Sequence, residues 1–79
     1  IDANEKIINY YNSNGEWHFK SSTEINVIFI YDISGKLIEK RNVGGKTVKI
    51  NSKNLQNGLH FIRLRGDFGF QVIKILNKN

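Results

Sequence analysis

Hydrophobic and polar residues alternate along most of the chain, in short runs that glycine-containing turns separate. Turns are expected at Asn14-Gly15, Ser34-Gly35, Gly44-Gly45 and Asn57-Gly58, and between Gly66 and Gly69. The runs between them are too short for substantial helices, and their spacing is typical of an all-β sandwich or barrel. We therefore expect one antiparallel β-sandwich domain over residues 1–79, with about seven strands at 6–12, 16–20, 24–32, 36–43, 47–50, 59–65 and 70–75.

The third of these expected strands is apolar on both faces, because Ile25, Val27 and Phe29 alternate with Ile28 and Ile30. An alternating strand normally presents one polar face to water, whereas a strand without a polar face belongs in the interior. We expect this strand to lie at the centre of the fold and to be covered on both sides.

The strand expected at 59–65 has one core face and a second face that turns basic toward its end, and the last strand carries Phe70 and Val72 on one face against Ile73 and Ile75 on the other. Ile62 and Leu64 share a face with His60, so this histidine is expected to be a half-buried packing residue. After Leu76 the sequence becomes polar, and Asn77-Lys78-Asn79 is expected to form a terminal tail.

The turn sequences predict particular backbone conformations. Asn14-Gly15 and Gly44-Gly45 suit two-residue hairpin turns, in which both central positions need a positive φ that asparagine and glycine tolerate. For Asp32-Ile33-Ser34-Gly35 we expect a type I turn followed by glycine in the left-handed region. The Asp32 side chain should then accept hydrogen bonds from amides of the loop.

The length and composition exclude several classes of protein. A chain of 79 residues buries only about 60% of its unfolded surface, which leaves one thin core and little room for an active-site cavity. There is no cysteine, so disulfides and thiolate metal sites cannot supplement this core. No apolar stretch approaches the roughly 20 residues of a transmembrane helix, and the amino terminus lacks signal-peptide features. Because it opens on Ile1, the chain is expected to be a piece of a longer protein.

The net charge of +5 is spread along several strands rather than clustered, which is typical of a solvated surface. A nucleic acid, lipopolysaccharide or an acidic receptor surface is the alternative partner that this charge allows. The segment 65–70 approaches the aromatic motif of RNA-recognition domains, but Asp67 interrupts the alternation and the helices of that fold are missing. A nucleic-acid-binding barrel remains an alternative hypothesis because of the positive charge, but these departures lead us to expect no nucleic acid partner.

Candidate catalytic and metal-binding residues are few. Gly45-Lys46-Thr47 resembles the end of a phosphate-binding loop, but the residues that follow predict a strand instead of the required helix. His18 and His60 lie on expected strands, and no serine occupies a nucleophile-elbow motif. Asp32 and Asp67 lie in separate turns, so converging metal ligands are not expected. We predict neither an enzyme nor a metal or cofactor site.

Three segments, taken in order, resemble the C-terminal sorting domain (type A) of type IX secretion cargo. Residues 31–36, Tyr-Asp-Ile-Ser-Gly-Lys, are similar to the family's Y-D-x-x-G-K element, and 55–60, Leu-Gln-Asn-Gly-Leu-His, to its L-x-x-G-x-Y element. Lys74 lies in a segment similar to the family's closing strand. There are two departures: the chain has no proline to match the family's opening Y-P-N-P at Tyr11-Asn12-Ser13-Asn14, and His60 replaces the usual tyrosine.

This resemblance implies an immunoglobulin-like sandwich at the carboxyl end of a larger exported protein of a Bacteroidetes-type bacterium. It implies that the cargo crosses the inner membrane by its own signal peptide. The type IX translocon then recognises the domain and exports the cargo from the periplasm to the cell surface or the extracellular medium. A surface sortase of the cysteine protease class usually removes the domain, often joining the cargo to anionic lipopolysaccharide. The implied partners are the translocon, the sortase and the attached amino-terminal cargo domain.

Recognition is expected to depend on the residues that match the family elements. These are Asp32, Gly35, Lys36, Gly58 and Lys74, although the two glycines have an equally good explanation as turn residues. The exposed edge of the terminal strand is a further candidate, because an edge strand can bind a partner by strand addition. We also expect the domain to offer the machinery the basic side chains of Lys74, Lys78, Arg63 and Arg65.

The rival hypothesis is an accessory module of a secreted hydrolase or adhesin. Such a sandwich would bind a glycan or a neighbouring protein through an aromatic stacking surface formed by Trp17, Tyr10 and Tyr11.

Overall fold

The computed structural model describes residues 8–78 and confirms the all-β class. All strand pairings are antiparallel, and in this part of the chain no helix has the length and apolar character needed to cross a membrane. The elements, in order, are β1 (Ile8–Ser13), β2 (Glu16–Asp32), β3 (Leu37–Asn51), the 3₁₀ turn η1 (Ser52–Asn54), β4 (Gly58–Gly66) and β5 (Gly69–Asn77).

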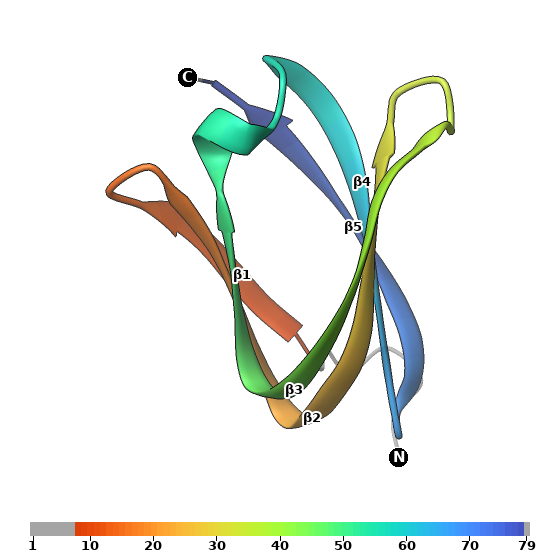
Figure 1. The fold of residues 1–79 in the computed structure, drawn as a ribbon. Coiled ribbons are helices and arrows are strands. Elements are labelled where there is room, and N and C mark those ends of the chain that lie inside the picture. Colours follow the sequence, from red (N-terminus) through yellow and green to blue (C-terminus); the bar gives the residue numbers. More distant parts are fainter. Residues whose placement is uncertain (1–7, 79) are drawn as a thin grey trace.

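Two long strands, β2 and β3, bend so that each takes part in both layers of the molecule (Figure 1). The first half of β2 pairs with β1 and with the end of β3, and these segments form the first layer. The second half of β2 pairs with β4 and with the start of β3, and β5 completes this second layer by pairing with β4. The fold is therefore one continuous sheet folded over on itself, with the core between its layers.

The expected count of about seven strands is wrong, because the described chain has five. The segments expected at 16–20 and 24–32 form the single strand β2, and those expected at 36–43 and 47–50 form the single strand β3. The part of the first expected strand before Ile8 lies outside the described residues. The hairpin expected at Gly44-Gly45 is also wrong, because both halves of β3 pair with β2 and not with each other. Gly45 has φ +146°, and this bend carries β3 from one layer to the other.

The turns expected at Asn14-Gly15 and between Gly66 and Gly69 are present in the structure, whereas the segment before Gly58 is an irregular connection from η1 to β4 and not a hairpin turn. Asn14 and Gly15 have φ values of +54° and +77°, as a two-residue hairpin turn of the expected type requires. The β4–β5 hairpin closes at the Gly66–Gly69 pair, so the segment that approached an RNA-recognition motif is a turn between two strands.

A bulge in β2 accompanies its bend and changes the face on which Ile25 lies. The register with β3 shifts between Lys20 and Ile25 and again between Ile25 and Val27. Ile25 is therefore fully buried together with Ile28 and Ile30, and does not share the face of Val27 as the simple alternation predicted.

The second half of β2 is central, as expected, but only one of its faces is covered by the other layer. Ile28 and Ile30 are fully buried between the layers, whereas Val27 and Phe29 on the opposite face are half-buried. The expectation of cover on both sides is wrong, because β2, β4 and β5 share an outer face that no described element packs against.

The core between the layers is almost entirely aliphatic. His60 is 3% exposed on the same face as Ile62 and Leu64, so its packing role is confirmed. Trp17, Val43 and Phe68 pack against the core from its margin. Its buried apolar members are Ile8, Phe19, Ile25, Ile28, Ile30, Val48, Ile50, Leu55, Ile62, Leu64, Ile73 and Ile75.

Asn77 connects the last strand to the opposite layer through a set of buried hydrogen bonds. Its Oδ1 accepts a hydrogen bond of 2.9 Å from the Trp17 indole, and its Nδ2 lies 3.0, 3.2 and 3.1 Å from the carbonyl oxygens of Ser52, Leu55 and Gln56. An indole only donates and carbonyls only accept, so these partners fix the orientation of the amide. The expectation that a polar tail begins at Asn77 is wrong, because this residue is 1% exposed within β5; Asn79 lies outside the described residues.

Gly66, at the end of β4, lies against the bend of β2. A side chain at this position would overlap the carbonyl oxygen of Glu24 and the ring of Phe68. The close approach of two backbones therefore requires glycine here for reasons of space.

We expect Asn77→Ala to lower the free energy of unfolding by about 2–3 kcal/mol, because it removes the buried hydrogen bonds that the amide makes with the Trp17 indole and with three carbonyl oxygens. Denaturant unfolding of the purified domain would measure this loss. Lys78→Ala, at the exposed neighbouring position, should change stability by less than about 0.5 kcal/mol. Equal stabilities of the two variants would show that the amide does not hold the layers together.

A second substitution tests the close approach at the β2 bend. Gly66→Ala should cost about 1–3 kcal/mol, since the added methyl group meets a backbone oxygen that cannot move without displacing β2. Gly44→Ala is the matched control, because its methyl group would lie 3.7 Å from the flexible Glu24 carboxylate, an ordinary contact. Thermal unfolding of both variants should therefore separate them, and a Gly44→Ala variant as unstable as Gly66→Ala would contradict this account.

Candidate recognition surface at the end of the second layer

The turn between β2 and β3 has the Asp32 hydrogen bonds and the left-handed Gly35 that its sequence predicted. Asp32 Oδ1 accepts hydrogen bonds from the amide of Ser34 at 2.9 Å, its hydroxyl at 2.6 Å and the amide of Lys36 at 3.0 Å. The Gly35 amide donates to the Asp32 carbonyl at 3.0 Å, and Gly35 has φ +88°. One carboxylate thus fixes the path of the whole turn, and Lys36 leaves it as an exposed side chain.

These hydrogen bonds also affect the acidity of the turn. The Ser34 hydroxyl, followed by the Lys36 amide, holds the pKa of Asp32 below its ordinary value of 3.8. The carboxylate is therefore ionised throughout the physiological range, and it acts as a hydrogen-bond acceptor for the turn.

The second family element, 55–60, reaches the same end of the molecule. Leu55 is buried, and Gly58 has φ +119° where β4 begins. Gly58 pairs with Asn77 of β5, so the start of β4 lies beside the Asn77 hydrogen bonds. His60 Nδ1 lies 3.2 Å from the Gly58 carbonyl oxygen, and this hydrogen bond requires the proton on Nδ1.

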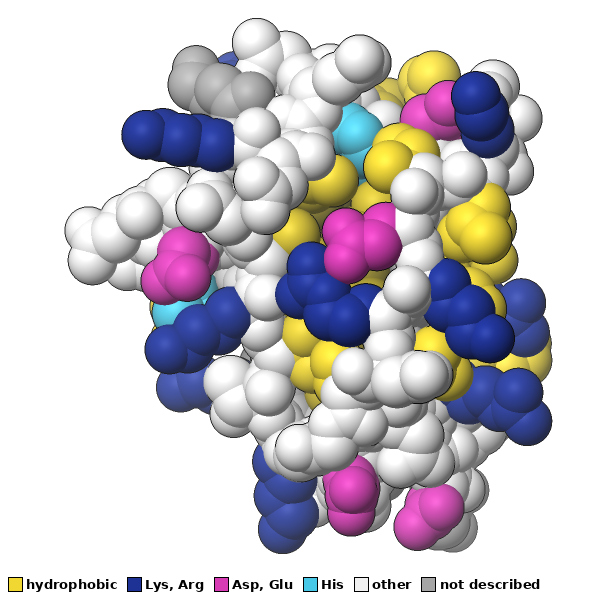
Figure 2. Space-filling view, in the orientation of Figure 1, with side chains coloured by type: hydrophobic (Ala, Val, Ile, Leu, Met, Phe, Trp, Pro, Cys, Tyr) yellow, Lys and Arg dark blue, Asp and Glu magenta, His cyan; other side chains and the backbone are white. Residues whose placement is uncertain are grey.

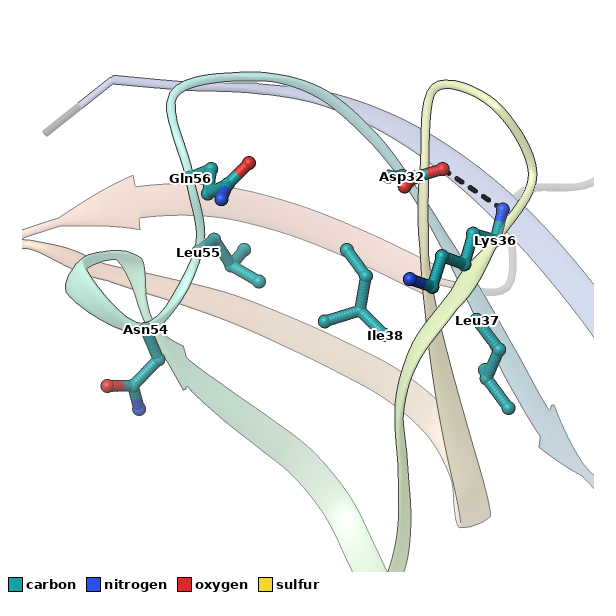
Figure 3. A pocket seen from close by; sticks show the side chains of 7 residues that line it. All are labelled: Asp32, Lys36, Leu37, Ile38, Asn54, Leu55 and Gln56. Atoms are coloured by element: carbon teal, nitrogen blue, oxygen red, sulfur yellow. Dashed lines mark hydrogen bonds between the residues drawn. The ribbon is translucent and has the colours of Figure 1, made fainter.

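A hollow of about 430 Å³ separates the two family elements (Figure 3). Asp32 and Lys36 line one side, Leu55 and Gln56 the other, and the side chains of Ile38 and Leu55 point toward one another across it. Ile38 is 47% exposed although it is large and apolar. We call this region, formed by residues 32–38 and 54–58, the motif end.

Lys74 lies apart from the motif end. It is exposed on β5, opposite Phe61 of β4, which in turn lies opposite Tyr31 of β2. Lys74 therefore belongs to the outer face of the second layer, whereas the hollow opens between the layers. The structure thus brings together Asp32, Gly35, Lys36 and Gly58 and leaves Lys74 on a neighbouring surface.

The described residues provide no cluster of metal ligands. No three histidine or acidic side chains of residues 8–78 lie close enough together to hold a metal ion. Gly45-Lys46-Thr47 lies inside β3, so no helix follows it as a phosphate-binding loop requires. The motif end has a hollow, an exposed cation at Lys36 and an exposed apolar side chain at Ile38, and these features can bind a partner.

The accessory-module hypothesis requires Trp17, Tyr10 and Tyr11 to form one stacking surface, and they do not. Trp17 packs at the core margin and donates its indole hydrogen bond to buried Asn77. Tyr10 pairs with Phe19 and Tyr11 with His18, so the two tyrosines lie on opposite faces of β1. Tyr11 stacks on His18 with ring centroids 4.8 Å apart, which occupies one face of its ring.

Sequence reasoning missed two residues that shape this region. Asn77 was assigned to a solvated tail, and its only sequence signal was its place two residues after Ile75, in phase with the buried face of β5. Ile38 carried no signal, because only the opposing segment 54–56 makes it part of a hollow.

The turn should stabilise the domain in a pH-dependent manner. Because the folded-state pKa of Asp32 is lowered, its contribution is complete above about pH 5 and is lost as the pH falls through 3.8 toward the folded value. The difference in unfolding temperature between wild type and Asp32→Ala should therefore shrink over this interval. Thermal unfolding of both proteins between about pH 2 and 7 measures it, and a difference independent of pH would contradict the role of the carboxylate.

Comparison with protein-family models matches residues 5–78 to the secretion system C-terminal sorting domain. A comparison with curated proteins finds no match. The family match covers both elements at the motif end and Lys74, and proteins with this signal are exported by the type IX system to the cell surface or the extracellular space. This is a family of sorting signals and not of enzymes. The chain therefore belongs to the secretion system C-terminal sorting domain family of type IX cargo.

Proposed function

We propose that the motif end is the surface by which the type IX translocon recognises this domain, and that a surface sortase removes the domain from its cargo after export. The observation that carries the proposal is the hollow shared by two segments separated in sequence, 32–38 and 54–56. Each segment includes part of a family element, and together they form a defined shape that a partner can bind.

The proposed site residues divide into those that shape the surface and those that contact the partner. Asp32 fixes the turn by three hydrogen bonds, and Gly35 and Gly58 supply backbone conformations with positive φ. Lys36 and Lys74 are exposed and carry charge, so they are the side chains that meet the machinery. The outer edge of β5 has no pairing strand among the described residues, and strand addition there would place a partner beside Lys74.

This division assigns the domain the role of a rigid substrate. Binding of the partner would depend on where Lys36 lies relative to the hollow, and the Asp32 carboxylate and Gly35 fix that position. Substitutions in the shaping residues would act through the conformation of the turn, whereas substitutions of the lysines would remove contacts and leave the fold intact.

The test fuses residues 1–79 behind a signal peptide and a fluorescent reporter, in bacteria with and without a working type IX system. We expect export only where the system works. Lys36→Ala and Lys74→Ala should each lower the exported fraction by about fivefold, the effect of losing about 1 kcal/mol of binding. Lys49→Ala is the matched control, because Lys49 is an exposed lysine on the part of β3 that belongs to the first layer.

Two outcomes would contradict the proposal. Reporter retained in the periplasm of both strains would show that the domain is not a sufficient sorting signal. Normal export of the Lys36 variant and of a variant with the hollow filled, Ile38→Trp, would show that recognition lies elsewhere on the domain. Far-ultraviolet circular dichroism of each variant confirms that it has folded.

A further inference from the structure

The outer face of the second layer carries basic and apolar side chains in alternating rows. One row crosses all four strands as Lys40, Phe29, Arg63 and Val72, which lie opposite one another in the register. Phe70 and Lys74 lie in the rows on either side of it. We call these six residues the basic–apolar face; in Figure 2, dark-blue side chains lie among yellow ones on the right of the view, beside the second layer.

Two large apolar side chains on this face are more than half exposed to solvent. Phe70 is 60% and Val72 52% exposed, although both belong to a strand whose opposite face is buried. Exposure of aromatic and aliphatic groups to water is unfavourable in free energy, and a contiguous patch of such groups often marks a binding surface.

Arg63 lies at the centre of this face and is held by aromatic rings. Its guanidinium carbon lies 4.1 Å from the centroid of the Phe70 ring and 5.8 Å from that of Phe29. Its Nε is buried without a hydrogen-bond partner, and among residues 8–78 no carboxylate pairs with it. A planar guanidinium fixed in this way is ready to bind a carboxylate in a bidentate manner without further loss of side-chain freedom.

The charge of the face selects the chemistry of the partner. Lys40, Arg63 and Lys74 lie on it, and Arg65 lies beside Phe70 in the next row. The residues in register on this face of β2, β4 and β5, between Val27 and Tyr31 and their partners, include no acidic side chain. A second copy of the domain would bring like charges together, so self-association through this face is disfavoured.

The arrangement of cations and apolar groups also favours a protein partner over a lipid membrane or a nucleic acid. The cations lie among the apolar side chains and not around them, so inserting the apolar groups into a bilayer would bury Arg63 without a counter-charge. The Arg63 guanidinium covers the Phe70 ring, which leaves less of its face for stacking by a base. A protein surface can offer carboxylates and apolar groups in the same alternation.

We infer that the basic–apolar face binds an acidic, partly apolar protein surface of the export machinery, with Arg63 receiving a carboxylate at the centre of the interface. This inference rests on the proposed function and adds to it a second surface with a partner of defined charge. The motif end and the basic–apolar face share the second layer, so one partner complex can contact both.

The test measures binding of the 79-residue domain to purified outer-membrane type IX translocon by biolayer interferometry. Arg63→Gln should weaken binding by about tenfold, and so should Val72→Glu, whose carboxylate would occupy Arg63 in place of the partner. The matched controls Lys49→Gln and Thr47→Glu make the same changes in charge at exposed positions of the first layer and should bind as wild type does. Affinity of the wild type should fall as salt is raised.

Phosphatidylglycerol vesicles and an oligothymidylate serve as the competing probes. If the face variants lose affinity for either of these while their affinity for the translocon is unchanged, the occupant is lipid or nucleic acid and the inference is wrong. Wild-type reporter exported normally, together with wild-type affinity of both face variants, would overturn this inference alone. Failure of the wild-type reporter to leave the periplasm would overturn the proposed function and this inference with it.

Discussion

The Asn77 amide holds the two layers of this small protein together at the end where its turns meet. The core is aliphatic and thin, so a buried polar group is tolerated only when its hydrogen bonds are made. Asn77 joins β5 to Trp17 in the first layer and to three carbonyl groups of the segment 52–56. The backbone of that segment also receives support from the first hairpin, since the Ser52 amide donates to the Gly15 carbonyl at 2.9 Å. The last strand therefore supports both layers.

The motif end depends on this connection. The segment that contains Leu55 and Gln56 leads from the first layer to the second and has little regular structure of its own. Asn77 binds its carbonyl groups, while the Asp32 carboxylate fixes the facing turn. Two separate polar side chains thus hold the two sides of the hollow, and the hollow can keep its shape without a large core beneath it.

The bend of β2 and β3 explains why one face of the domain is left open. A single sheet of this length can enclose a core only by folding over, and the fold directs the Ile28 side of the second layer inward. The opposite side has no layer to cover it, and its aromatic rings lie against cations instead, such as Phe29 with Lys40 and Arg63. The two proposed binding surfaces, at the end and on the outer face of the second layer, both depend on this folding of the sheet.

The sequence by itself determined the all-β class, the Asn14-Gly15 hairpin and the Asp32 turn, because each depends on local backbone preferences and on alternation over a few residues. Its motifs at 31–36 and 55–60 also indicated the family. Only the tertiary structure decided that Gly44-Gly45 is a bend and not a hairpin, that Ile25 turns inward and that Asn77 is buried. The physical reason is that a glycine pair permits either a bend or a turn, and a polar residue either solvation or buried pairing. Partners distant in sequence, such as Trp17 for Asn77 and β2 for both halves of β3, select between these states.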